Sequence, residues 1–73
     1  MSAQVVSIGT TDAHHKIGTQ IRLVRIGTAT VAPSGDYRAD YELARQAIEA
    51  HVGRPVKELL SERYEGHLIF REN

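Results

Sequence analysis

A long run of apolar residues, Ile17 to Val31, constrains the fold of this chain more than any other feature. Its odd positions read Ile17, Thr19, Ile21, Leu23, then Ala29 and Val31, and all of these except Thr19 are apolar. This alternation predicts a half-buried β-strand. The even positions are mixed, because Gln20 and Arg22 suit solvent but Val24 and Ile26 do not. Either Gly27 hosts a bulge or bend that swaps the two faces, or both faces are covered, one of them by a partner.

The length of this run argues against a straight strand. At ~3.3 Å per residue, a strand from residue 17 to residue 31 would span ~50 Å. A compact domain of this size has a radius of gyration of only ~11 Å. We therefore predict a kink at Gly27 or a second hairpin close to it, with Ile21 and Leu23 directed toward the helix.

A shorter apolar stretch precedes the run. Val5, Val6 and Ile8 predict a first strand over Gln4–Gly9. The polar segment Thr10–Lys16 is predicted to be a hairpin loop, with Asp12 and Gly18 as its turn-forming residues.

An amphipathic helix follows the apolar run. Pro33 ends the strand, Ser34 or Asp36 can cap the helix, and Gly53 stops it after about Val52. The apolar stripe is Tyr37, Tyr41, Ala44, Ala47, Ile48 and Val52, and the opposite face carries Arg38, Glu42, Arg45, Gln46 and Glu49. Glu42–Arg45 and Arg45–Glu49 are predicted to pair across one turn.

The C-terminal part predicts a second, short helix and a last strand. Pro55 suits a first helical position, and Val56, Leu59, Leu60 and Tyr64 then share one face. Gly66 ends that helix, and His67–Arg71 alternates as a short strand. We expect one α+β domain over residues 1–73: a small antiparallel sheet of three to four strands, in the order β-β-[β]-α-α-β, with helices packed on one face.

Composition limits the classes of function. Nine Lys and Arg balance nine Asp and Glu, so the net charge is zero, which argues against general nucleic-acid binding. The chain has no cysteine, which favours a reducing compartment. The first residues do not resemble a signal peptide, and no apolar run approaches the ~18 residues of a membrane span. We expect a cytoplasmic protein of a bacterial host, with no membrane partner.

No pattern of residues predicts catalysis, a cofactor or a metal. Adjacent residues of an extended chain point in opposite directions, so His14 and His15 are poorly placed to ligate one ion, and His51 suits a helix end. Residues of catalytic type are Asp12, His14, Asp36, Asp40, Glu58, Glu62 and His67, none in a recognised spacing. We expect a non-enzymatic protein without cofactor or metal; the alternative is a small enzyme or metal-binding protein that uses His14 or His67.

A second alternative is a small RNA- or DNA-binding protein. Lys16, Arg22 and Arg25 lie along the long strand and could contact phosphates. No exposed aromatic platform for base stacking accompanies them, because the aromatic residues fall mostly on faces assigned to the core.

Contact with another protein is the leading hypothesis. A small sheet leaves an open strand edge, Val24 and Ile26 point away from the helix in one interpretation, and zero net charge does not oppose association, including homodimerisation. The predicted partner-binding residues are Arg22, Val24 and Ile26 on the strand, and Arg38, Glu42, Arg45 and Glu49 on the helix.

The order of elements also resembles a known group of proteins. It is carried by Val5-Val6-Ser7-Ile8, Ile21-Arg22-Leu23-Val24-Arg25-Ile26, the helix Ala39 to Val52, and Gly66-His67-Leu68-Ile69-Phe70. In this order and in size the chain resembles the anti-CRISPR proteins, small inhibitors of bacterial defence encoded by phages or mobile elements. The resemblance implies a protein that blocks a CRISPR-Cas-type complex by occupying a surface. Several anti-CRISPR proteins are strongly acidic mimics of DNA, and this neutral chain departs from that pattern.

Overall fold

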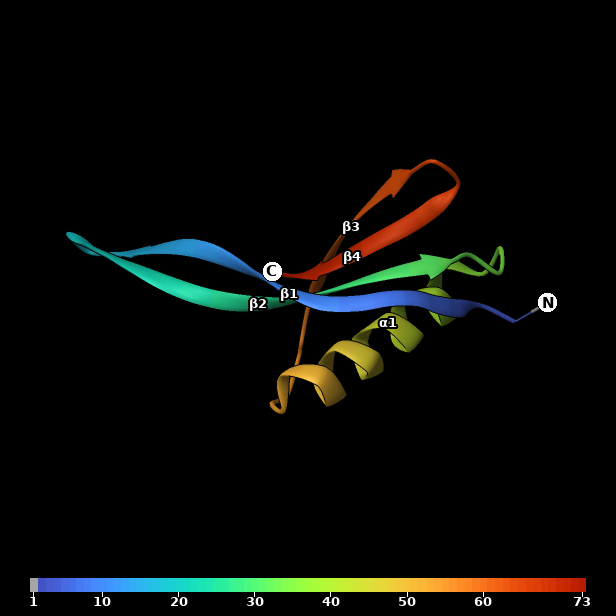
Figure 1. Cartoon of the computed structure of the whole chain (residues 1–73), viewed down its shortest axis with the longest axis horizontal. Helices are drawn as coiled ribbons and strands as arrows, with labels where there is room; N and C mark the ends of the chain where they lie inside the picture. The colour runs from blue at the N-terminus through green and yellow to red at the C-terminus, as the bar shows by residue number, and fades with distance from the viewer. Residues whose placement is uncertain (1) are drawn as a thin grey trace.

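The fold is one four-stranded antiparallel sheet with one helix on one of its faces. The computed structural model describes residues 2–73. Its elements are β1 (Gln4–Ile17), β2 (Gln20–Ala32), α1 (Tyr37–Val52), β3 (Leu59–Tyr64) and β4 (His67–Glu72). The strands lie in the order β1-β2-β4-β3, and each pairing is antiparallel. The α+β class is confirmed, and Figure 1 shows α1 beneath the β1–β2 half of the sheet.

The first two strands form one long hairpin. Ile17 pairs with Gln20 across the two-residue turn Gly18–Thr19, and Gly18 has a φ of 63°. Gly at the first central position with positive φ is the pattern of a type II′ turn. The predicted loop over Thr10–Lys16 is therefore wrong, because that segment is strand. Its polar side chains are tolerated there because both faces of the segment are largely exposed.

The predicted kink at Gly27 and its alternative, a second hairpin close to Gly27, are also wrong. Strand β2 runs unbroken through Gly27, and the irregularity of the hairpin lies in β1, between Val5 and Ser7. Gly27 is needed for a close approach of the helix: a Cβ there would overlap Cγ2 of Ile48 and lie 3.0 Å from Cγ1 of Val52.

The helix has the predicted boundaries. The Asp36 side chain accepts a hydrogen bond from the backbone N–H of Ala39 at 3.3 Å, which makes it the N-cap. Gly53, with a φ of 73°, donates its N–H to the Glu49 carbonyl at 3.0 Å and ends the helix. Ser34 has another role, since its hydroxyl donates to the buried carboxylate of Asp40 at 2.8 Å.

The core lies between α1 and the inner halves of β2 and β4. It consists of Ala29, Val31, Ala44, Ile48, Val56, Leu59, Leu68 and Phe70. The ring of Phe70 lies 5.9 Å from the ring centroids of both Tyr37 and Tyr41. The Tyr41 hydroxyl accepts the backbone N–H of Leu59 at 2.8 Å, so the helix also holds the start of β3.

The predicted second helix does not form. Residues 55–58 are irregular, and Leu59–Tyr64 is strand β3. Glu65 and Gly66 both have positive φ, 48° and 80°, which is the geometry of a type I′ turn joining β3 to β4. Pairing with β4 therefore overrides the helical spacing, and it directs Leu59 to the core and Leu60 to the other face. The last strand is confirmed, with Leu68 and Phe70 buried.

Candidate interaction surface

The outer half of the hairpin projects from the body as a two-stranded ribbon. Strand β4 pairs with β2 only over Thr28–Val31, whereas the hairpin continues to its turn at Gly18. We call residues 11–26 the arm. Figure 1 shows the arm extending beyond both α1 and the β3–β4 hairpin, and the longest dimension of the molecule is 47 Å. We expected a bend to keep the long strand within the body. Instead the strand stays unbent, and the projecting arm is the main feature of the molecular shape.

Large apolar side chains are exposed on the arm. Ile17, Ile21 and Leu23 are 59%, 69% and 60% exposed. Ile21 and Leu23 share the helix side of the sheet with the buried Ala29 and Val31. The prediction that they pack on α1 is wrong, because they lie past the end of the helix.

The opposite face of the arm carries Val24 and Ile26. Both are half-buried and alternate with the helix-side positions, so they point away from α1. They line a groove of about 290 Å³ together with Ala13, His15, Arg54, Leu60, Arg71, Glu72 and Asn73. The groove joins the base of the arm to the open face of β3 and β4. Arg22 lies on the same face, nearer to the turn.

Three hydrogen bonds, one of them also an ion pair, fasten the arm at its base. The Glu72 carboxylate accepts the backbone N–H of Gly27 at 2.6 Å, just past the last residue pair of β2 and β4. The Arg54 guanidinium donates to the same carboxylate and to the carbonyl of Arg25, both at 2.9 Å. Sequence reasoning missed Arg54 and Glu72, because only the tertiary fold brings residues 25, 54 and 72 together.

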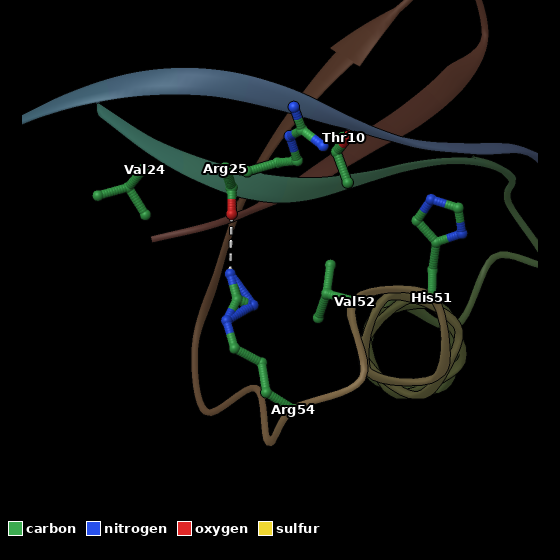
Figure 2. Close-up of a pocket in the computed structure, with 6 residues that line it drawn as sticks. All are labelled: Thr10, Val24, Arg25, His51, Val52 and Arg54. Atoms are coloured by element: carbon green, nitrogen blue, oxygen red, sulfur yellow. Dashed lines mark hydrogen bonds between the residues drawn. The ribbon is translucent and has the colours of Figure 1, made fainter.

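A second hollow, of about 470 Å³, lies under the base of the arm at the end of α1. Figure 2 shows Arg54 reaching from the loop after α1 up to the Arg25 carbonyl, beside Val52 and His51. Thr10 and Val24 complete the lining. Three of these six residues are Arg25, His51 and Arg54, but the helix C-terminus beside them carries a partial negative charge that disfavours an anion. The hollow therefore gives no clear preference for an anionic ligand.

The predicted contact residues of the helix are placed apart from the arm surface. Arg45 donates to Glu42 at 2.7 Å and to Glu49 at 2.9 Å, as the helical spacing predicts. The same Arg45 donates to the Val56 carbonyl at 3.2 Å, and Glu49 accepts the Val56 N–H at 2.9 Å. These two residues hold the loop after α1, while Arg38 is exposed on the first turn.

The Glu42 carboxylate gives a prediction for acid titration. Its hydrogen bond from Arg45, and next the one from Gln46, lower the pKa of Glu42 from 4.5 to about 2. Because the folded-state pKa lies below the unfolded one, this stabilisation is present above about pH 4.5 and is lost as the pH falls toward 2. We expect the Glu42 side-chain carbon signal in NMR to titrate with a midpoint near 2. The midpoint should move back toward 4.5 in Arg45→Met, and a wild-type midpoint near 4.5 would contradict the ion pair.

The basic residues of the nucleic-acid alternative do not share one face. Lys16 and Arg25 lie on the helix side of the arm, and Arg22 lies on the other. Arg25 also pairs with Asp12 at 3.4 Å.

Residues of catalytic or ligand type are likewise scattered. His14 and His15 lie on opposite faces of the arm, His51 lies in the last turn of α1, and His67 begins β4. Over residues 2–73, no three His, Asp or Glu side chains are grouped so that they could hold a metal ion. No helix in this range is long and apolar enough to span a membrane.

No protein-family model, curated protein or solved structure matches the chain. The resemblance to anti-CRISPR proteins therefore stays a prediction, and the surface itself is the basis for a functional proposal.

Proposed function

We propose that this chain is a non-enzymatic protein-binding module and that the arm is its main contact element. The observation that carries the proposal is the exposure of three large aliphatic side chains on the part of the ribbon that β4 does not pair with, Ile21 and Leu23 on the helix side and Ile17 on the opposite face. Large aliphatic side chains gathered on one projecting element are typical of an interaction surface.

The energetics of the arm support this proposal. An isolated two-stranded hairpin is marginally stable in water, because it has no layer against which to bury its side chains. Among the described residues, hydrogen bonds of Gly27, Arg54 and Glu72 hold the arm at its base. A partner that packs on the arm would supply the missing layer and bury the aliphatic side chains, at ~25 cal/mol per Å² of apolar surface.

The narrower proposal is inhibition of a CRISPR-Cas-type complex by occlusion of a surface. The supporting points are the small size, the element order and a projecting arm that could reach into a cleft of a larger assembly. Because the net charge is zero, occlusion would rest on shape and apolar contact, and mimicry of DNA charge would contribute nothing.

The test is binding of purified CRISPR-Cas effector complexes by the wild type and by Leu23→Asp. Leu23 is exposed in the free protein, so this change should alter stability by less than about 0.5 kcal/mol. Binding should weaken at least ~10-fold, since a central aliphatic contact is replaced by a charge that must be desolvated.

A matched control is Val6→Asp. Val6 is 57% exposed but lies in the body, next to the irregularity of β1. It should bind like the wild type. Equal binding by all three proteins would show that the arm is not part of the interface. Failure of the wild type to bind any effector complex would reject the inhibitor role.

Nucleic-acid binding is the second candidate, with weaker support. Arg22 lies on the open face of the arm, and Arg54 and Arg71 line the groove at its base. Phosphate contacts would make binding fall steeply with salt. Salt-independent binding of an RNA or DNA oligonucleotide would exclude this candidate.

A further inference from the structure

The outer edge of β1 along the arm is open, regular and self-complementary in charge. Strand β1 is the outermost strand of the sheet, so its outer edge has no neighbour. In the body that edge is interrupted by the irregularity between Val5 and Ser7, which disfavours pairing. Beyond this irregularity the register is unbroken from Ser7 to Ile17. The pairing-competent part of the β1 edge therefore includes the whole arm.

The alternation of the hairpin tells which backbone groups are free at this edge. Ile17 and Gln20 close a two-residue turn, so they form a hydrogen-bonded pair, and such pairs recur at every second residue. The backbone N–H and C=O groups of Asp12, His14 and Lys16 then point outward. The opposite edge of the ribbon, on β2, supports this alternation. There the Arg25 carbonyl and the Gly27 N–H point outward, to Arg54 and Glu72.

We propose that a second copy of this chain occupies this edge, with the two β1 strands antiparallel and His14 facing His14 across a two-fold axis. In that register Asp12 of each copy lies opposite Lys16 of the other. This proposal rests on the proposed function, because it uses the same arm as a protein-contact element.

Charge favours this register over those centred on Asp12 and on Lys16. Pairing centred on Asp12 would oppose two carboxylates, and pairing centred on Lys16 would oppose two ammonium groups, both of which are destabilising. Charged residues on an edge strand normally block such pairing. Here the two charges have opposite signs and lie at equal distances from His14, so an antiparallel copy neutralises both. Within each copy Asp12 already pairs with Arg25 at 3.4 Å. Arg25 and Asp12 of one copy and Lys16 of the other would therefore form a row of alternating charges across the joined sheet.

The pairing joins two ribbons into one four-stranded sheet and adds up to six main-chain hydrogen bonds. Three or more strands are needed for independent stability, so the arm gains what it lacks in the monomer. An edge interface of this length falls in the small size class of weak complexes, and zero net charge adds no long-range repulsion. Dimerisation should therefore be visible at high concentration by analytical ultracentrifugation.

A first experiment uses cysteine cross-linking, which is unambiguous because the chain has no cysteine of its own. Facing residues of a hydrogen-bonded pair have Cα atoms about 5.5 Å apart, within the range of about 4.4–6.8 Å that a disulfide spans. His14→Cys should thus form a disulfide-linked dimer on oxidation. His15→Cys is the matched control: its two copies are two residues out of register, about 8 Å apart, and should stay largely monomeric. Equal cross-linking of the two variants would overturn the register.

A second experiment impairs only the pairing of the outer β1 edge with a second copy. His14→Pro deletes an outward N–H that the monomer does not use, so the arm should keep its fold and the dimer should be lost. Lys16→Glu should weaken dimerisation at least ~10-fold relative to Lys57→Glu, which makes the same charge change outside the arm. If both variants dimerise like the wild type, the proposal is wrong.

The outcomes separate this inference from the proposed function. Leu23 lies on β2, one strand in from the seam and opposite His14, and its backbone does not pair across the seam, so Leu23→Asp should lose an effector complex and still dimerise. A protein that stays monomeric at all concentrations but binds an effector complex through Leu23 would reject the second copy and keep the protein-binding role. A dimer without any such binding would support the second copy and reject the inhibitor role.

Discussion

Phe70→Ala is expected to destabilise the fold by about 3–5 kcal/mol, because it empties the centre of a small core. Phe70 is fully buried and touches Tyr37 and Tyr41 across the helix–sheet interface. A chain of 73 residues has a total stability of only about 4–11 kcal/mol. The variant should therefore populate the unfolded state strongly, and urea unfolding followed by circular dichroism measures the loss.

The matched control for this prediction is Tyr64→Ala. Tyr64 is another aromatic residue of the β3–β4 hairpin, but it is 61% exposed. Its truncation should cost less than about 1 kcal/mol. Similar losses for the two variants would mean that Phe70 is not the centre of the core.

Gly27→Ala is expected to cost about 1–3 kcal/mol, the usual range for overpacking. The added Cβ would overlap Cγ2 of Ile48, lie 3.0 Å from Cγ1 of Val52 and lie 3.3 Å from Oε1 of Glu72. The helix must then move away from the sheet at the point where the arm begins. We expect faster amide hydrogen exchange in the arm as well as a lower denaturation midpoint.

Two variants test the cause of this loss. Gly9→Ala lies in the same hairpin with no atom within 4 Å of its new Cβ, and it should be neutral or slightly stabilising. Ile48→Ala removes the methyl group that Gly27→Ala strikes, so the double variant should lose less stability than the sum of the two single variants. Strict additivity would contradict the steric explanation.

Local signals in the sequence were sufficient for the helix and the last strand. Asp36 caps the helix N-terminus, and Gly53 ends the helix in a left-handed conformation. Each acts through hydrogen bonds within one helical turn, and the structure confirms both positions. Leu68 and Phe70 alternate with polar residues, and that period is enough to place them in the core. The ion pairs of Arg45 follow from helical spacing for the same reason.

The second helix and the bend were mispredicted because each depended on a distant partner. The apolar spacing of Val56, Leu59 and Leu60 fits a helix, but the turn at Glu65–Gly66 pairs this segment with β4. The bend at Gly27 was inferred from the size of a compact domain. The real constraint on Gly27 is the helix packed on it, which no local pattern reveals.

The long apolar run by itself determined that this chain contains a strand with one face for a core and another of mixed character. Only the tertiary structure decided which part of that strand is covered. The helix is 16 residues long and packs along the inner half of the hairpin, so Ala29 and Val31 are buried while Ile21 and Leu23 are exposed. The physical reason is that alternation specifies the face of a strand on which a side chain lies, whereas its burial depends on how far the neighbouring element reaches.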